Sequence, residues 1–381
     1  MTHALSSTSL LLAAEHIAAL AAKHAAEAEA RRLIDSDVAA LVIEAGFARH
    51  FVPTRFGGSA GTFAELLAAV AEIGEGCAST AWFASLAASV GRMAAYLPEA
   101  GRRAIWARCP DTIVVGALVP SGEARPVPGG WRVSGRWTYV SGVDLSSWAL
   151  VCARTATAEG GQEPRFFAVP REAYRTVDTW FNTGMRATGS NTLLLDEVTV
   201  PKDHSVALDT LLAGLAPDAE APCHRTPMKA ANGLTLTAPL LGAARGARNR
   251  WTELTEAKLQ GPGGAISGGA DRTAAELVLA RADGQIDAAR LLLERVASVS
   301  DSGAVTALDT VRNGRDCALA ADLLATTVDT LLRTSGSRGQ AESEDLQRFW
   351  RDVNSGAGHS GLQFAPAASA YARSLLTPAA D

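Results

Sequence analysis

The sequence predicts a mainly α-helical chain with a central β-domain. Residues 1–110 carry long stretches with apolar side chains at helical spacing, whereas residues 111–205 carry short β-branched and aromatic runs that Pro, Gly, Asp and Ser interrupt. Residues 206–381 return to long helical patterns after a stretch rich in Ala, Pro and Gly. We therefore expect an N-terminal helical domain over 1–110, a β-domain over 111–205, and a linker with a C-terminal four-helix bundle over 206–381.

Helix-start signals order the N-terminal part. The residues expected to open its helices are Thr8 or Ser9, Asp35, Thr62, Ser79 and Pro98. Between the second and third helices, residues 57–61 read GGSAG and match the G-x-S-x-G string of serine hydrolases. That motif requires a strand–turn–helix elbow. Here it follows a helix and a Pro-containing loop, so we interpret it as a chance match.

The β-domain is expected to be antiparallel, a barrel or sandwich with about six to eight strands. Its strand-forming runs are TIVVGALV, WRVSG, SWALVCAR, RFFAV and TLLLDEVTV. Turn-forming stretches separate them, including PSGEARPVPGG, DLSS and TAEGGQEP.

Four long helical segments follow, at 224–259, 271–299, 306–335 and 343–378. Their length predicts a bundle. The glycine-rich residues 260–271 are expected to form a flexible connector, and residues 206–223 a linker that covers the site. Small residues over 241–247 predict a close approach between helices.

Composition excludes several classes of protein. The net charge is −5 and no basic cluster occurs, which argues against binding to nucleic acid or to a membrane surface. No uncharged apolar run is long enough to span a bilayer, and the N-terminus lacks the features of a signal peptide. The five scattered cysteines predict reduced thiols in the cytoplasm and no metal site. No phosphate-binding P-loop and no G-x-G-x-x-G is present.

One C-terminal segment, ESEDLQRFWRDVNSGAGH over 342–359, ends in an isolated histidine. Its apolar side chains at helical spacing, expected to pack inward, are Leu346, Phe349, Trp350 and Val353. The rest of the helix is expected to carry Arg348, Arg351 and Asp352. His359 follows Asp352 by two helical turns if the helix continues. Two glycines weaken that helix, so His359 is either presented to a cavity or packed as an ordinary core histidine.

A second segment, GWRVSGRWTYVSGVDLSSWALVCA over 130–153, combines a strand pattern with aromatic and hydroxyl residues. Trp137, Tyr139 and Ser141 alternate along the strand and are expected on one face. A ring followed by a small hydroxyl on the same face suits the binding of a flat cofactor. An aromatic strand of this kind is otherwise typical of core packing.

Together the two segments resemble flavin-dependent monooxygenases of the acyl-CoA dehydrogenase fold, the group D oxygenase components of two-component systems. The C-terminal segment matches L-x-R-x-W-R-D-V followed by His, and the strand segment matches G-x-x-[VL]-x-G-x-[KW]-x-[WY]-x-[ST]. The order of helical domain, β-domain and four-helix bundle is also that of the fold, so the resemblance covers almost the whole chain.

The resemblance implies roles for particular residues. His359 would act beside the reactive face of the flavin as proton donor or substrate orienter, and Ser141 would hydrogen-bond near flavin N5. Tyr139 would lie against the flavin ring, with Trp137 on the same face. Leu118, in the strand and turn at 116–122, would meet the flavin pyrimidine edge, although the segment also fits an ordinary strand end.

Other motifs extend this site. Trp82, in the S-T-A-W string, and Ser121 would line the substrate pocket. Thr188 and Ser190, in the segment after G-M-R, would reach flavin or substrate, and Arg186 would pair with a carboxylate at a subunit interface. The alternative for this segment is simple turn chemistry.

Two predictions concern phosphate. Arg245, set among apolar residues, requires an anion, which a flavin phosphate or a buried Asp or Glu would supply. Ser335 and Ser337 would hold a phosphate near a helix N-terminus, or they belong to a plain interhelical loop.

The implied function is a reduced-flavin-dependent monooxygenase, a hydroxylase or N-oxygenase. A separate NAD(P)H:flavin reductase would supply reduced FMN or FAD, and the reaction with O2 would proceed through a C4a-hydroperoxyflavin. The substrate would be small, of the secondary-metabolite kind, and the subunits would form a homotetramer. Phenol hydroxylases of the family carry a His after S-T-A-W where this chain reads ASLAASVG, so indoles, polyketides, aminosugars and amines stay open.

Two alternatives remain. The first is an acyl-CoA dehydrogenase with bound FAD and a glutamate base, although the C-terminal region lacks the G-G-x-G-Y and Y-E-G-T strings of that class. The second is a non-catalytic helical protein.

Overall fold

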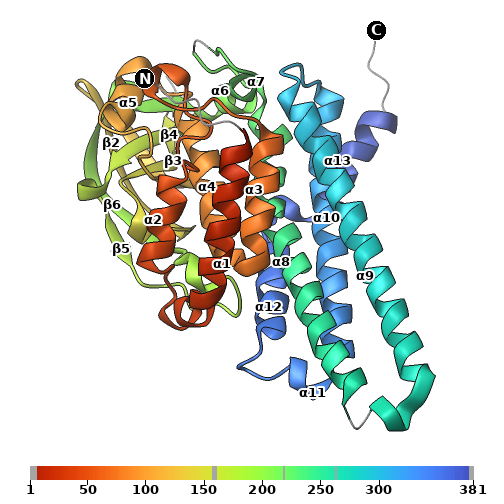
Figure 1. Cartoon of the computed structure of the whole chain (residues 1–381). Coiled ribbons are helices and arrows are strands. Elements are labelled where there is room, and N and C mark those ends of the chain that lie inside the picture. Colours follow the sequence, from red (N-terminus) through yellow and green to blue (C-terminus); the bar gives the residue numbers. More distant parts are fainter. Residues whose placement is uncertain (1–6, 157–160, 218, 262–263, 377–381) are drawn as a thin grey trace.

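The computed structural model describes residues 7–156, 161–217, 219–261 and 264–376. Its N-terminal helices are α1 (Ser7–Arg31), α2 (Ser36–Glu44), α3 (Phe63–Gly76), α4 (Ala78–Ala94) and α5 (Glu99–Trp106). Helices α1, α3 and α4 stand between the sheet and the C-terminal helices (Figure 1). Two predicted caps are confirmed. The Asp35 carboxylate accepts from the Asp37 amide, and Thr62 forms a reciprocal capping box with Glu65.

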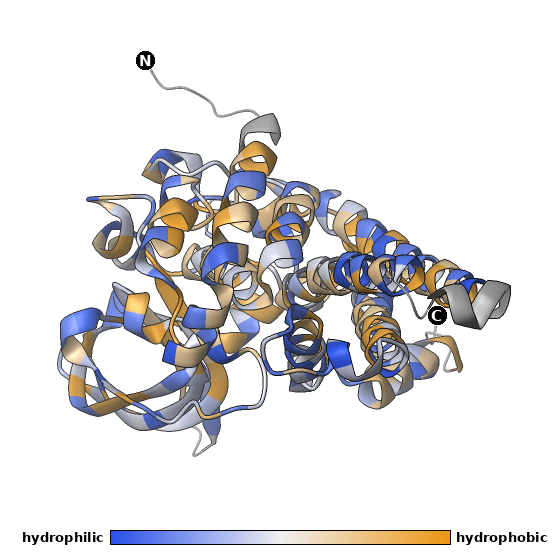
Figure 2. Ribbon diagram, turned by 60° about the horizontal axis from the view of Figure 1, so that its bottom comes forward, coloured by the Kyte–Doolittle hydropathy of each residue, from blue (hydrophilic) through white to orange (hydrophobic). Residues whose placement is uncertain are grey.

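Seven strands form one curved sheet in the order β5-β6-β2-β1-β3-β4-β7, and Figure 2 shows it wrapped into an open barrel. The strands are β1 (Val114–Val127), β2 (Gly130–Val140), β3 (Trp148–Ala156), β4 (Gln162–Pro170), β5 (Arg175–Val177), β6 (Asn191–Pro201) and β7 (Ser205–Ala207). The expectation of a purely antiparallel domain is wrong at one pair, because β1 and β3 run parallel. Their register shifts between Ala117 and Gly122, so Leu118–Ser121 leave the ladder there.

The C-terminal part contains α8 (Met228–Gln260), α9 (Gly264–Asp301), α10 (Ala307–Thr334), the short α11 (Gly336–Gly339), α12 (Asp345–Ala357) and α13 (Phe364–Leu376). Helix α9 begins inside the predicted connector. The predicted fourth helix over 343–378 is two helices, because the chain leaves helical geometry at His359, with φ −61° and ψ 137°. A 3₁₀ turn at Ser360–Leu362 then buries Leu362 before α13 begins.

Small residues bring α3 and α8 together, as predicted. A Cβ added at Gly242 would lie 2.0 Å from the Ala71 carbonyl oxygen, and one at Gly74 would lie 2.9 Å from Gly242 Cα. Only glycine at both positions permits this contact, which locks the N-terminal helices to the bundle.

The linker after β7 contains α6 (Leu208–Leu212) and α7 (Pro222–Arg225). The Arg92 guanidinium donates to the carbonyls of Cys223 and Thr226 at 2.9 and 2.8 Å. Arg92 lies in the last turn of α4 and Trp82 in its second, about 15 Å apart along the helix. The described linker therefore packs at the end of α4 remote from Trp82, and the expectation that it covers the site is wrong.

Two further features accompany this fold. The five cysteines are all unpaired, as predicted, and four of them are buried. In the described part of the chain, no helix combines the length and apolar character that crossing a bilayer requires.

Candidate active site

Three predicted site residues from distant parts of the chain meet at one place. Trp82 comes from α4, Ser141 directly follows β2, and His359 lies in the turn after α12. The Trp82 Nε1–H donates to Ser141 Oγ at 3.2 Å, and the Trp82 and His359 rings lie 5.9 Å apart between centroids. We call Trp82, Ser141 and His359 the central cluster.

The end of β2 presents Ser141 through a bulge. The register with β6 shifts between Trp137 and Val140, and Tyr139 adopts a left-handed conformation with φ +63°. Gly142 follows at φ +70°, where a Cβ would lie 2.8 Å from the Phe83 ring. The chain therefore turns sharply against α4, which brings Ser141 to Trp82.

The bulge also separates two residues that alternation places on one face. The Trp137 side chain is 1% exposed, and its Nε1–H donates to the Cys152 carbonyl at 2.7 Å. The expectation that Trp137 shares the face of Tyr139 is wrong, because the extra residue of the bulge reverses the alternation. This position leaves Trp137 no surface with which to contact a bound flavin.

Tyr139 presents an exposed aromatic ring beside Trp180. Its side chain is 72% exposed, and its ring meets the edge of Trp180 at 6.1 Å between centroids. Phe181 and Val119 are similarly exposed. A flat heteroaromatic ring fits such a surface, because stacking would remove large apolar groups from water. The predictions overlooked Trp180, although the aromatic pair before G-M-R was a usable signal.

The remaining predicted residues, Leu118 and Ser121, lie on β1. Leu118 is half-buried and packs against the smaller core formed by α4, α5 and β3. Ser121 is exposed at the end of the register shift.

His359 is held in a defined tautomer. Its Nδ1 accepts the Gly361 N–H at 3.0 Å, so the neutral ring carries its hydrogen on Nε2. Neighbouring protein displaces water and lowers the pKa of His359 below its ordinary value, although the side chain still reaches solvent. The residue therefore presents a neutral Nε2–H donor beside Trp82.

Asp352 does not share a continuous helical face with His359, because α12 ends between them. Asp352 and Arg348 are buried, although they lie outside the apolar face that was expected to pack inward. The Met185 N–H donates to Asp352 Oδ1 at 2.6 Å. Burial raises the pKa of Asp352 to about 6, against the Met185 hydrogen bond and the charge of Arg348, which lower it. Asp352 thus anchors the segment before β6.

That segment carries two hydroxyls that are linked to Ser141 by hydrogen bonds. Ser190 Oγ lies 2.8 Å from Ser141 Oγ and 2.7 Å from Thr188 Oγ1. Thr188 Oγ1 donates to the Met185 carbonyl at 2.8 Å. Ser190 therefore bonds Ser141 directly, and Thr188 bonds Ser190 in turn. We call Ser141, Ser190 and Thr188 the hydroxyl chain.

The predicted phosphate ligands lie elsewhere in the chain. Arg245 has an ionic partner in Glu75 of α3, at 3.6 Å, which favours the acidic alternative to a phosphate. The Ser335 hydroxyl donates to the Leu332 carbonyl at the end of α10, and Ser337 is exposed. Figure 1 places this turn at the far end of the bundle from the sheet. Within one chain, the structure does not bring these serines to the central cluster.

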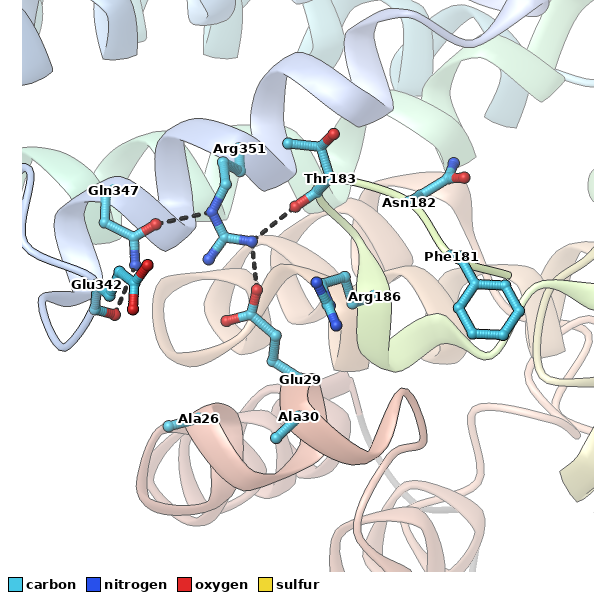
Figure 3. Close-up of a pocket in the computed structure, with 10 residues that line it drawn as sticks. All are labelled: Ala26, Glu29, Ala30, Phe181, Asn182, Thr183, Arg186, Glu342, Gln347 and Arg351. Atoms are coloured by element: carbon cyan, nitrogen blue, oxygen red, sulfur yellow. Dashed lines mark hydrogen bonds and ion pairs between the residues drawn. The ribbon is translucent and has the colours of Figure 1, made fainter. Parts of the chain in front are cut away.

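An open cavity of about 680 Å³ lies between α1, α12 and the segment 181–186. Figure 3 shows Arg351 bridging its walls, bonded to Glu29, to the Thr183 carbonyl at 2.6 Å and to Gln347 at 2.7 Å. Arg186 also lines it. None of the central cluster does. The short 3₁₀ helix Arg186–Thr188 connects this cavity to the central cluster. Arg186 at its start lines the cavity, and Thr188 at its end belongs to the hydroxyl chain.

Comparisons with known proteins agree with this architecture. The N-terminal domain model of acyl-CoA dehydrogenases matches residues 7–106, and the C-terminal domain model matches residues 234–364. The oxygenase component of an FADH2-dependent resorcinol hydroxylase from Rhizobium sp. is 31% identical, over 91% of this chain and 89% of that protein.

Solved structures share the fold along almost the whole chain. The 3-HSA hydroxylase from Rhodococcus sp. RHA1 superposes with a TM-score of 0.92 at 27% identity, covering 100% of this chain and 99% of the other. XiaF from Streptomyces sp., in complex with FADH2 and glycerol, gives a TM-score of 0.90 at 25% identity, covering 98% and 97%. This chain therefore belongs to the flavin-dependent monooxygenases of the acyl-CoA dehydrogenase fold, oxygenase components that use reduced FAD or FMN.

Proposed function

We propose that this chain hydroxylates a small, electron-rich substrate of the secondary-metabolite kind, an aromatic compound in the first place. A separate NAD(P)H-dependent reductase would provide the reduced flavin, as the name "oxygenase component" of the Rhizobium relative suggests. The observation that carries the proposal is the convergence of Trp82, Ser141 and His359 from three distant segments. Packing alone does not require an indole, a hydroxyl and a neutral histidine at one place.

The exposed surface of Tyr139 and the neighbouring backbone of 118–121 would hold the flavin ring, with Ser141 at its reactive edge. Reduced flavin, when bound, reacts with O2 and supplies the oxygen atom that is transferred. Trp82 would form a wall of the substrate pocket and exclude water from the reacting atoms. The Nε2–H of His359 would donate a hydrogen bond to the transferred oxygen or to a polar group of the substrate.

The central cluster and hydroxyl chain distinguish this proposal from an acyl-CoA dehydrogenase. Abstraction of an α-proton requires a carboxylate base at the site. None of Trp82, Ser141, Thr188, Ser190 and His359 carries one, and the anchoring Asp352 is occupied by the Met185 amide.

The test supplies reduced FMN or FAD from an unrelated flavin reductase with NADH, in isotopically labelled O2. The substrates would be a panel of phenols, resorcinols and indoles, with medium-chain acyl-CoA thioesters for comparison. We expect one labelled oxygen atom in an aromatic product. Desaturation of an acyl-CoA without oxygen incorporation would instead establish the dehydrogenase.

A homotetramer is part of the proposal. Helix α13 buries none of its residues within one chain, and it exposes Phe364, Leu375 and Leu376. Apolar groups of this kind favour packing against another subunit. Light scattering of the purified protein tests this, and a monomer at micromolar concentration would contradict it.

A further inference from the structure

We infer that the hydroxyl chain fixes Ser141 as a hydrogen-bond acceptor and thereby favours reduced over oxidised flavin. The inference rests on the proposed placement of Ser141 at flavin N5. It assigns Thr188 and Ser190 as specificity-determining residues that act through Ser141.

One end of the chain is a fixed acceptor. The Met185 carbonyl cannot donate, so the 2.8 Å contact with Thr188 Oγ1 requires the threonine hydrogen to point at it. The same carbonyl also accepts from Trp180 Nε1 at 3.0 Å and from the Thr188 amide at 3.2 Å. Met185 and Thr188 are both buried, which leaves no water to replace the contact.

The other end is a fixed donor. The Trp82 indole nitrogen only donates, so Ser141 Oγ accepts at this contact. Trp82 is buried in α4, and its ring is therefore held in place.

Counting hydrogens then sets the direction of the chain. Three hydroxyls hold three hydrogens, and three contacts need them: Ser141 to Ser190, Ser190 to Thr188, and Thr188 to Met185. All three form only when Ser141 donates to Ser190. Ser141 then keeps one lone pair free, which accepts from an incoming donor.

The two redox states of flavin differ at this point. Reduced flavin carries a hydrogen on N5 and donates, whereas oxidised flavin has a bare N5 that accepts. To donate to oxidised flavin, Ser141 must stop donating to Ser190. Either that hydrogen bond is lost, or the donors along the hydroxyl chain reverse and the bond from Thr188 to the Met185 carbonyl is lost. Either change loses one buried hydrogen bond, whereas the binding of reduced flavin leaves all three bonds of the hydroxyl chain in place.

The anchor of the chain resists such a change. Met185 has a left-handed backbone at φ +53°, which a non-glycine residue adopts at a cost. Its N–H is bonded to Asp352 and its carbonyl to Trp180. The carbonyl therefore cannot turn away from Thr188 without breaking both.

The test measures dissociation constants for oxidised and reduced FMN and FAD separately, by anaerobic titration of flavin absorbance and fluorescence. Thr188→Val removes the hydroxyl while keeping the shape, and Ser190→Ala disconnects Ser141. Each should lower the preference for reduced over oxidised flavin by about fivefold, the effect of one hydrogen bond. Thr188→Ser should keep the wild-type preference.

Thr192→Val is the matched control. The Thr192 hydroxyl is also buried, but it bonds the Thr179 hydroxyl and is not part of the hydroxyl chain. If Thr188→Val and Ser190→Ala keep the wild-type ratio, or weaken both redox states equally, the inference is overturned. Failure of the wild type to bind either redox state would instead overturn the proposed function.

Discussion

The end of β2 and the end of α12 both break their regular structure to present a functional side chain, but they do so with different supports. At β2, a bulge exposes Tyr139 and turns Ser141 towards Trp82, and uncharged hydrogen bonds hold the result. At α12, the helix stops before His359, whose Nδ1 accepts from the Gly361 amide. The same helix carries the buried Asp352, which binds the Met185 amide, with the charge of Arg348 nearby.

The difference separates the two segments by their response to pH. The hydroxyl chain itself contains no group that titrates near neutrality. It is linked to Asp352 through Met185, whose N–H bonds that carboxylate and whose carbonyl accepts from Thr188. The α12 anchor contains a buried carboxyl whose pKa is raised to about 6. The comparison therefore predicts that pH acts on the candidate site through Asp352 of α12.

The largest expected effect comes from Asp352→Asn. The folded-state pKa of Asp352 is about 6, raised from 3.8. The stability it contributes is therefore present below about pH 4 and is lost as pH rises through 6. Between pH 4 and 7 the wild type should lose up to about 3 kcal/mol relative to Asp352→Asn, at about 1.4 kcal/mol per pKa unit.

Urea unfolding at several pH values measures this difference. Asp37→Asn, which replaces an exposed carboxylate in the first turn of α2, is the control and should follow the wild-type profile. A constant difference between Asp352→Asn and wild type would mean that Asp352 is ionised throughout, which would remove the contrast between the two segments.

His359→Ala tests the side chain that follows the end of α12. Loss of the Nε2–H donor should lower product formation by about 100-fold with little change in stability, because the side chain reaches solvent. His359→Gln, which keeps a donor, should recover part of the activity. Because neighbouring protein lowers the pKa of His359 below its ordinary value, the ring is neutral above neutral pH and its contribution should be constant there.

The exposed His16→Ala is the control for this substitution and should match the wild type. Equal turnover in His359→Ala and wild type would contradict the catalytic role, and His359 would then serve only as the cap of its 3₁₀ turn.

At the β2 end, Trp137→Phe tests the buried side of the bulge. It removes the hydrogen bond to the Cys152 carbonyl and leaves that acceptor buried. The free energy of unfolding should fall by about 2 kcal/mol, while the affinity for reduced flavin stays as in the wild type. A loss of flavin affinity without a loss of stability would restore Trp137 to the cofactor site.

Tyr139→Ala tests the exposed side and should give the smallest effect on folding. The ring is largely exposed, so stability should change by less than about 0.5 kcal/mol. Loss of stacking should weaken the binding of reduced flavin about tenfold. Unchanged affinity in an anaerobic titration would show that the exposed surface does not receive the flavin.

Local signals predicted much of the fold. Asp35 and Thr62 cap the helices that they precede, because a cap depends only on residues a few positions apart. The inward face of α12 was predicted correctly at Leu346, Phe349 and Val353, since helical spacing sets which side chains share a face. The alternation along β2 failed at Tyr139, because nothing local revealed the bulge.

The site was predicted less completely for the same reason. Trp82, Ser141 and His359 were named from separate motifs, but their contact depends on how α4, β2 and α12 pack. Ser190 and Thr188 were noted as groups near a ligand, whereas their bonds to Ser141 appear only in the folded chain.

By itself, then, the sequence determined the helix–sheet–bundle order, the capping residues and the family, because these follow from local periodicity and short motifs. The tertiary structure decided the parallel pairing of β1 with β3, the burial of Asp352 and Trp137, and the direction of the hydroxyl chain. Those features depend on desolvation and on hydrogen bonds between residues far apart in the chain, which no local pattern encodes.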